Sequence, residues 1–96
     1  MMVIVVENAP PRLRGRLSLW LLEARAGTYV GAYSARTRER IWGEVKAMLD
    51  NGSAVLAWTA SNDAGFSIET AGANRREPVD YDGFPLMRFL PPAKET

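Results

Sequence analysis

The sequence predicts an α+β sandwich in which two helices cover one face of a mainly antiparallel sheet. The chain opens with a continuous apolar, β-branched run, Met2–Val6. Two stretches with helical spacing of apolar residues follow, and the second half holds short β-type runs separated by turn signals. The expected order of elements is β-α-β-α-β-β-β. The ferredoxin-like arrangement is the nearest common plan for this order.

Residues 2–27 predict the first strand and the first helix. Met2–Val6 has the pattern of a strand buried on both faces. Pro10-Pro11 cannot extend that strand but suits the start of a helix, which Ala26-Gly27 then ends. The expected core stripe of this helix is Leu13, Leu17, Trp20, Leu21 and Ala24. Leu19 and Leu22 lie on nearly the opposite side, so we expect the helix to meet a second apolar surface.

The middle of the chain predicts a strand and a second helix. Thr28–Tyr33 is rich in β-branched and aromatic residues, which favours a strand. Ser34 can cap a helix that runs to Asp50, where Asn51-Gly52 supplies a left-handed stop. The expected core stripe of this helix is Ile41, Val45, Met48 and Leu49. The residues expected on its solvated face are Arg36, Arg38 and Arg40.

A β-hairpin is predicted next, from Ala54–Ala60 through the loop Ser61–Gly65 to a strand that begins at Phe66. In this second strand two sets of side chains alternate, which predicts one buried and one wet face. The set expected to be buried is Phe66, Ile68 and Thr70. The set expected to be wet is Ser67, Glu69 and Ala71.

Beyond residue 71 the sequence predicts a loop, a turn and a last strand. Gly72–Pro78 has the composition of a loop, and Asp80 and Asp82 are expected to form a turn before Gly83. Phe84–Leu90 is expected to be a short strand, which its proline restricts to a sheet edge. We therefore divide the chain into a ferredoxin-like core domain, residues 1–78, and a C-terminal strand and tail, residues 79–96.

The composition is that of a small globular protein and excludes several chemistries. The 96 residues suffice for a single domain, with 47% hydrophobic and 24% charged residues. The absence of cysteine and histidine excludes disulfides, thiolate metal sites and imidazole catalysis. A metal site would need oxygen ligands and a hard cation. The apolar start lacks the basic segment of a signal peptide, so we expect a cytoplasmic protein that does not contact a membrane.

Charge is unevenly distributed, although the net charge is only +1. Residues 10–25 carry four arginines against one glutamate. Arg12, Arg14 and Arg16 fall in the first two turns of the expected helix, where the helix dipole disfavours cations. A bound polymeric anion would offset this cost. A plain solvated basic face, or a regulatory or toxin domain whose basic helix binds an acidic protein, are the open alternatives.

Two segments, ENAPPRLRGRLSLWLLEARAGTYVG and NRREPVDYDG, together resemble the small CRISPR adaptation protein family, Cas two, in its type I-E branch. The resemblance extends over essentially the whole chain. It implies a ferredoxin-like protomer and a two-fold homodimer that bridges two dimers of the partner integrase, Cas one. Such an assembly captures double-stranded prespacer DNA without sequence preference and inserts it into the repeat array. The implied role is spacer acquisition in antiviral defence.

The same resemblance implies functional sites by position. The positions that match DNA-backbone contacts are Arg12, Arg14 and Arg16 on the first helix and Asn74, Arg75 and Arg76 in the later loop. Residues 79–90 match the tail that docks on the integrase. In this tail the expected anchors for strand addition are Leu86, Met87 and Phe89. The alternative for these three is that they close the protein's own sheet.

Glu7 is the candidate for a catalytic or metal-binding residue. Many members of the wider family are reported as magnesium-dependent nucleases, with an aspartate at the end of the first strand that two copies share. Here that place reads Glu7-Asn8. Glu7 could still hold Mg2+, so an endonuclease acting on RNA or DNA is the alternative function. Because the aspartate is missing, we favour a noncatalytic subunit that needs no cofactor, with Glu7 capping or pairing with the following helix.

Overall fold

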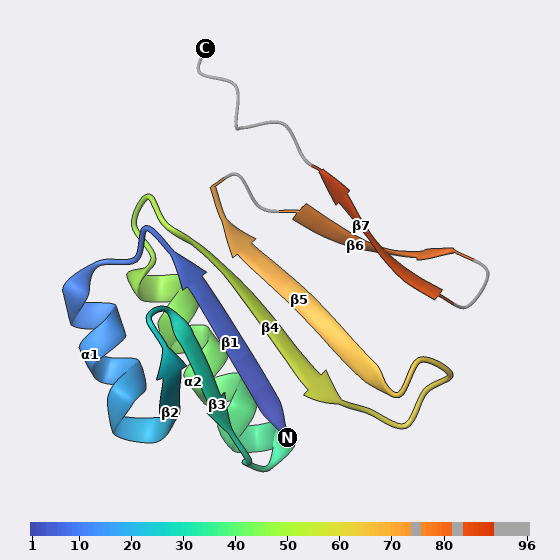
Figure 1. The fold of residues 1–96 in the computed structure, drawn as a ribbon, viewed down its shortest axis with the longest axis horizontal. Coiled ribbons are helices and arrows are strands. Elements are labelled where there is room, and N and C mark those ends of the chain that lie inside the picture. Colours follow the sequence, from blue (N-terminus) through green and yellow to red (C-terminus); the bar gives the residue numbers. More distant parts are fainter. Residues whose placement is uncertain (74–75, 82–83, 90–96) are drawn as a thin grey trace.

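The computed structural model describes the backbone of residues 1–73, 76–81 and 84–89 and the side chains of residues 1–73. A five-stranded sheet in the order β2-β3-β1-β4-β5 carries two helices, and each neighbouring pair of its strands is antiparallel (Figure 1). The predicted α+β class and ferredoxin-like arrangement are therefore confirmed. The elements are β1 (Met2–Glu7), α1 (Pro11–Trp20), β2 (Leu22–Arg25), β3 (Thr28–Gly31), α2 (Ala35–Met48), β4 (Ser53–Thr59), β5 (Phe66–Gly72), β6 (Arg76–Tyr81) and β7 (Phe84–Phe89).

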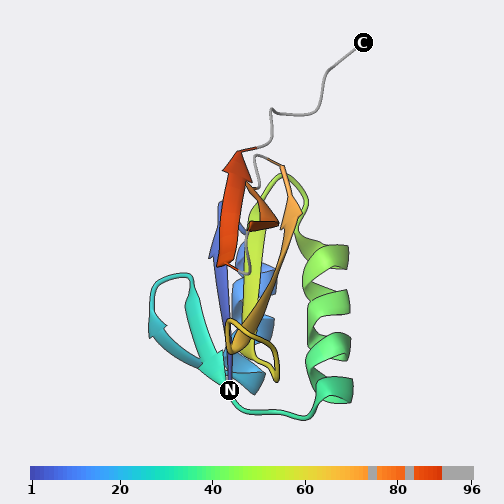
Figure 2. The same cartoon turned by 90° about the vertical axis from the view of Figure 1, so that its right-hand side faces the viewer.

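The hydrophobic core lies between the sheet and the two helices. Alternate residues of β1 point into it, and α1 contributes two fully buried leucines. Figure 2 shows the sheet nearly edge-on, with α2 along one side of it. The core residues of the described chain are Met2, Ile4, Val6, Leu13, Leu17, Leu21, Tyr29, Ile41, Trp42, Val45, Leu49, Ala54 and Leu56.

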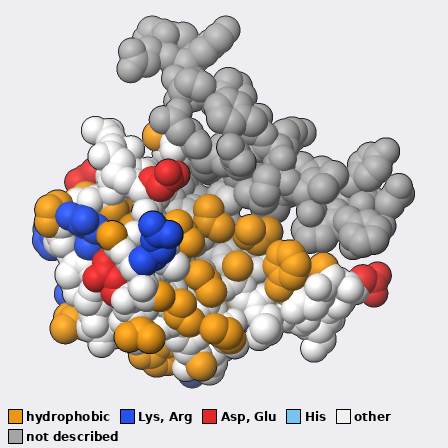
Figure 3. All heavy atoms as spheres, in the orientation of Figure 1, with side chains coloured by type: hydrophobic (Ala, Val, Ile, Leu, Met, Phe, Trp, Pro, Cys, Tyr) orange, Lys and Arg blue, Asp and Glu red, His pale blue; other side chains and the backbone are white. Residues whose placement is uncertain are grey.

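The opposite face of the sheet carries no helix from the described residues. It is formed by the side chains that alternate with the core positions, and strand register places them beside one another: Val3, Val5, Thr28, Val30, Val55, Ala57, Ile68 and Thr70. We call these eight residues the open face. Hydrophobic side chains gather over this side of the molecule (Figure 3). Within the described strands β1, β3, β4 and β5, Glu7 is the only charged residue that points to this side.

The first helix is shorter than predicted, and its expected second half is a strand. α1 ends at Trp20, because Leu21 has extended backbone angles (φ −126°, ψ 157°). The next four residues pair with β3 as β2, across a turn in which Gly27 has φ 81°. Ala24 is consequently exposed on β2 instead of packing in a helical core stripe. Leu19 is 79% exposed on α1, and no described residue covers it.

The second helix agrees closely with its prediction. Ser34 caps α2, and its Oγ accepts a hydrogen bond from the backbone N–H of Thr37 at 3.3 Å. Ile41, Val45 and Leu49 are buried, as expected, and Trp42 joins them. The left-handed residue at the C-terminal end is Asp50, with φ 51°, rather than the following Asn-Gly pair.

The two faces of β5 are the reverse of the prediction. Ala71 packs against the core and Glu69 contacts α2, so the odd-numbered side chains face the helices. Phe66 is 39% exposed, and it shares the open side of the sheet with Ile68. The alternation itself was predicted correctly. The buried side was predicted wrongly, because Glu69 and Ala71, and not Phe66 and Ile68, are on the side of β5 that faces the helices.

The C-terminal half also contains a strand that the sequence did not predict. β6 covers residues expected to form a loop and a turn, so Pro78 and Asp80 lie in a strand. β6 pairs with β7 as a two-stranded sheet separate from the main one, with Val79 opposite Leu86. The division between a core at 1–78 and a tail at 79–96 stays a prediction, and its boundary falls within β6.

Candidate nucleic-acid interface

α1 displays three arginines over a buried leucine pair. Leu13 and Leu17, one turn apart, are fully buried against the sheet. The exposed cations of this helix are Arg12, Arg14 and Arg16. Pro10 provides no side-chain hydrogen bond at the N-terminus, and the first turn contains no acidic residue. The helix therefore does not offset the positive charge at its own start.

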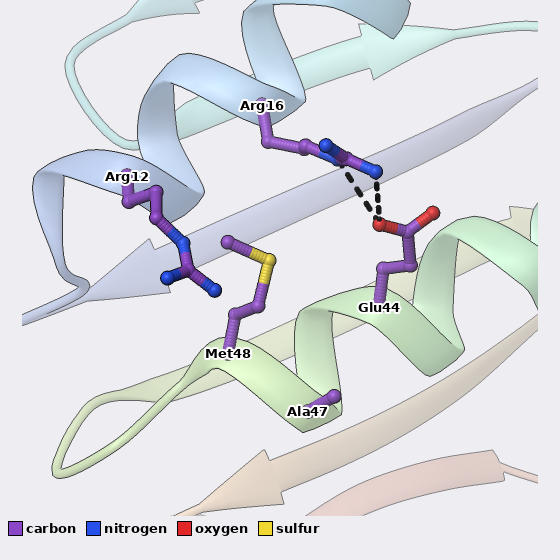
Figure 4. A pocket seen from close by; sticks show the side chains of 5 residues that line it. All are labelled: Arg12, Arg16, Glu44, Ala47 and Met48. Carbon is purple, nitrogen blue, oxygen red and sulfur yellow. Dashed lines mark hydrogen bonds and ion pairs between the residues drawn. The ribbon is translucent and has the colours of Figure 1, made fainter.

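The three arginines do not form a single row. Arg12 and Arg16 are four residues apart and lie on the same side of α1. Arg14 is rotated from Arg12 by about 200°. Arg12 and Arg16 face α2, where they line a groove of about 370 Å³ together with Glu44, Ala47 and Met48 (Figure 4). The basic surface is thus split between a groove and the opposite side of the helix.

Arg16 is held by two neighbours. Its Nη2 and Nε atoms both approach Oε1 of Glu44, at 2.9 and 3.0 Å. Its guanidinium carbon also lies 5.4 Å from the ring centroid of Trp20, within the range of a cation–π contact. The side chains of Arg16 and Glu44 are 50% and 38% exposed. Such an exposed pair is worth at most about 1 kcal/mol, so Arg16 is oriented but not locked.

Arg12 and Arg14 have no ion pair with any residue among 1–73. Arg12 extends into the groove toward Met48, as Figure 4 shows. The backbone of Arg14 accepts a hydrogen bond of 3.1 Å from Oγ of Ser18, and its side chain stays exposed. Within the described part of the chain, both guanidinium groups are therefore free to meet a phosphate.

Glu7 stands at the end of β1 and is exposed. It makes no hydrogen bond or ion pair with another described side chain, so the expected cap or pairing with α1 is wrong for residues 1–73. Asn8, which follows it, has φ 54° and turns the chain toward α1. No group of three or more Asp or Glu side chains among the described residues could hold a metal ion. A single protomer offers Mg2+ one carboxylate here, so the metal site shared by two copies stays a prediction.

The remaining predicted site residues fall partly outside the described chain. Asn74 and Arg75 lie outside the described residues. Arg76 begins β6 instead of lying in a loop, and its side chain is not described. The predicted anchors of the tail, Leu86, Met87 and Phe89, lie on β7, and their side chains are likewise outside the description.

A second cluster, which the sequence did not predict, lies between α2 and the β4–β5 hairpin. The guanidinium carbon of Arg38 lies 4.2 Å from the ring centroid of Trp58. Arg38 is half-buried, so its expected place on a solvated face is wrong. Trp42 donates a hydrogen bond to Glu69, and these residues border a cavity of about 190 Å³. The four-residue spacing of Arg38 and Trp42 on one helix was the available signal.

Tyr29, on β3, contacts both α1 and β2. Its side chain is fully buried, and its hydroxyl donates a hydrogen bond of 3.1 Å to Oε2 of Glu23. Burial raises the pKa of Tyr29 above 10.0, and the hydrogen bond and negative charge of Glu23 raise it further. The backbone N–H of Gly27 donates to the same carboxylate oxygen at 3.4 Å. Glu23 is therefore engaged within the β2–β3 hairpin.

A comparison with protein-family models matches residues 1–86 to a family described as CRISPR-associated protein (Cas_Cas2CT1978). The chain belongs to this Cas two family. It is accordingly a CRISPR-associated protein of the Cas two type, so the predicted family is confirmed and its type I-E branch stays a prediction. The match includes all of the open face and the three arginines of α1. No helix within the described residues has the length and apolar character to cross a bilayer.

Proposed function

We propose that this Cas two chain is the DNA-binding scaffold subunit of a type I-E spacer-acquisition complex. The observation that carries the proposal is the display of Arg12, Arg14 and Arg16 on α1 in a member of this family. Guanidinium groups on a rigid helix fix the position of phosphates without reading base sequence. That property suits the capture of foreign DNA, whose sequence is arbitrary.

The proposed assembly is a homodimer formed through the open face. Its eight residues carry no charge and lie on a continuous side of the sheet. Val5 is 38% exposed at the centre of this surface. Packing two such faces would remove apolar area from water, which is the main driving force of protein association. Two-fold symmetry would then present each arginine twice.

The DNA-binding surface would extend beyond α1 in this proposal. Asn74, Arg75 and Arg76 are expected to add contacts from the segment that follows β5, which gives ten arginines in the dimer. If about half of them engage phosphates, log affinity should change with log salt with a slope of roughly −4 to −5. A partner protein, the integrase Cas one, would perform the strand transfer.

β7 is the proposed docking strand for the integrase. It pairs with β6 in a sheet of two strands, so within the described chain its outer edge has no strand beside it. An open edge supports strand addition, for which Leu86, Met87 and Phe89 are the proposed anchors.

The test is copurification of the chain with the integrase, followed by salt titration of duplex binding, with and without residues 79–96. Binding of unrelated duplexes with equal affinity and a steep salt slope supports the scaffold. A shallow slope, or a preference for an acidic protein over DNA, contradicts it. Removal of residues 79–96 should abolish copurification while the purified dimer remains.

A further inference from the structure

The proposed DNA interface contains a carboxylate within hydrogen-bond distance of one of its arginines. Glu44 reaches across from α2 to Arg16 on α1, and both Nε and Nη2 point at the same oxygen, Oε1 (Figure 4). The two helices thus place a negative charge inside a basic groove. A negative charge at this place repels a polyanion.

Other contacts make the arrangement well defined. Trp20 lies on the same side of α1, one turn after Arg16, and its ring supports the guanidinium. Glu44 is only 38% exposed, because it lies on the side of α2 that faces α1. Met48, one turn further along α2, forms the apolar wall of the groove beside Arg12. Arg12 itself has no acidic partner among the described residues.

We propose that Glu44 competes with DNA phosphate for Arg16 and so limits the affinity of the α1 surface. The inference rests on the proposed function, since it requires duplex DNA to contact α1. In the free protein Glu44 occupies the Nε/Nη2 edge of the guanidinium, one of the two edges that can bind an oxyanion in a bidentate manner. A phosphate takes this edge only when Arg16 leaves Glu44. Arg12 and Arg14 need no such exchange.

The Arg16–Glu44 ion pair is weak enough for a phosphate to displace Glu44. An exposed ion pair is worth at most about 1 kcal/mol, which corresponds to roughly a fivefold change in binding constant. Each protomer would therefore lose about two- to fivefold in affinity to this competition. A lower affinity for DNA suits a scaffold that must release its DNA after insertion.

The experiment compares Glu44→Gln with Glu39→Gln in the full-length protein, using duplex DNA of arbitrary sequence as the probe. Both changes remove one negative charge from α2, but Glu39 makes no ion pair with a described residue and lies away from the groove. Glutamine keeps an oxygen that can accept from Arg16, so the fold should be preserved. We expect Glu44→Gln to raise affinity by about two- to fivefold per protomer beyond Glu39→Gln. The salt slope should steepen by about 0.9 for each additional phosphate that is bound.

A double-mutant cycle with Arg16→Gln separates competition from a general charge effect. In the Arg16→Gln background, Glu44→Gln should have no more effect than Glu39→Gln. Equal effects of Glu44→Gln and Glu39→Gln on the unmodified background would overturn the proposal. Loss of affinity in Glu44→Gln would also overturn it, because Glu44 would then orient Arg16 for DNA rather than compete. If Arg12→Gln and Arg14→Gln leave duplex binding unchanged, the proposed function fails as well.

Discussion

The indole Nε1–H of Trp42 donates a hydrogen bond of 2.8 Å to Oε2 of Glu69. Trp42 belongs to α2 and is 4% exposed, whereas Glu69 belongs to β5, an edge strand of the five-stranded sheet. The bond joins the helical layer to that edge at a point where Arg38 covers Trp58. These contacts fix the orientation of α2, the same helix that presents Glu44 to the arginines of α1.

Trp42→Phe should lower the free energy of unfolding by about 2–3 kcal/mol, because the hydrogen bond is removed and a smaller ring occupies a buried site. Urea denaturation followed by circular dichroism measures the change. Glu69→Gln is the matched control, because an amide oxygen can still accept from the indole, and it should cost less than about 1 kcal/mol. A Trp42→Phe protein as stable as the parent would show that the indole does not stabilise the packing of α2 on β5.

Arg12→Gln and Arg14→Gln should each weaken duplex binding equally for unrelated sequences. Each change should also flatten the salt slope of log affinity by about 1 for every phosphate that the variant no longer binds. Arg40→Gln is the control, since Arg40 is an exposed arginine on α2 without an ion pair among the described residues. Equal effects of all three substitutions would indicate that binding depends on net charge and not on the surface of α1.

Val5→Lys should dissociate the proposed homodimer. A lysine buried without a partner at the centre of the open face costs about 3–5 kcal/mol, which is over a hundredfold in the dimer dissociation constant. Sedimentation equilibrium measures this constant. Leu19→Lys introduces the same residue at an exposed position of α1, away from the sheet, and should leave the dimer intact. Dissociation by Leu19→Lys, with Val5→Lys still dimeric, would place the interface elsewhere.

Glu7→Ala should leave spacer acquisition unchanged, and its duplex binding should equal that of the parent with or without a chelator of divalent metals. The alternative, a magnesium-dependent endonuclease, predicts metal-dependent cleavage by the purified parent protein and its loss in this variant. Asp63→Ala, in the exposed loop between β4 and β5, controls for removal of a surface carboxylate. Loss of acquisition in Glu7→Ala alone, with assembly preserved, contradicts the purely structural role.

The protein should lose stability at alkaline pH in part through Tyr29. Its pKa in the folded state is raised above 10.0, mainly by burial and further by Glu23. The unfolded chain therefore releases the phenolic proton first, and the free energy of unfolding falls as pH rises from about 10 toward the folded-state pKa. Below that range the contribution is fully present. Tyr29→Phe should remove this part of the alkaline decline, as measured by urea denaturation at a series of pH values.

Tyr33→Phe is the control for the alkaline experiment. The hydroxyl of Tyr33 donates a hydrogen bond of 2.6 Å to the carbonyl of Trp20, but the residue is 44% exposed. If Tyr29→Phe and the parent lose stability in parallel above pH 10, the buried hydroxyl is not the source of the decline.

The sequence was sufficient for α2 and insufficient for the end of α1. In α2 a capping serine and a regular apolar stripe indicate the same helix, and the structure agrees. Residues 22–25 are all good helix formers, and no proline or glycine immediately precedes them. They form β2 because pairing with β3 satisfies their backbone groups, a tertiary interaction that local propensity does not reveal.

The arginines of the candidate interface could be predicted because their exposure follows from the spacing of Leu13 and Leu17. The partner of Arg16 could not, since Glu44 is 28 residues away and is brought near only by the packing of α1 on α2. β6 was missed for a similar reason. Its proline and charged residues are poor strand formers, and only pairing with β7 makes it a strand.

Among the described residues, helices cover one side of the sheet only, which affects how much of this protein a cell must make. If the bare side is buried by a second copy, each chain completes its structure only when another is at hand, and scarcity shifts molecules toward degradation. Dimer formation would then require expression above a threshold level. Below that level few dimers would form. Under the proposed function, few molecules would then present the arginines of two protomers to one DNA duplex, and few spacers would be acquired.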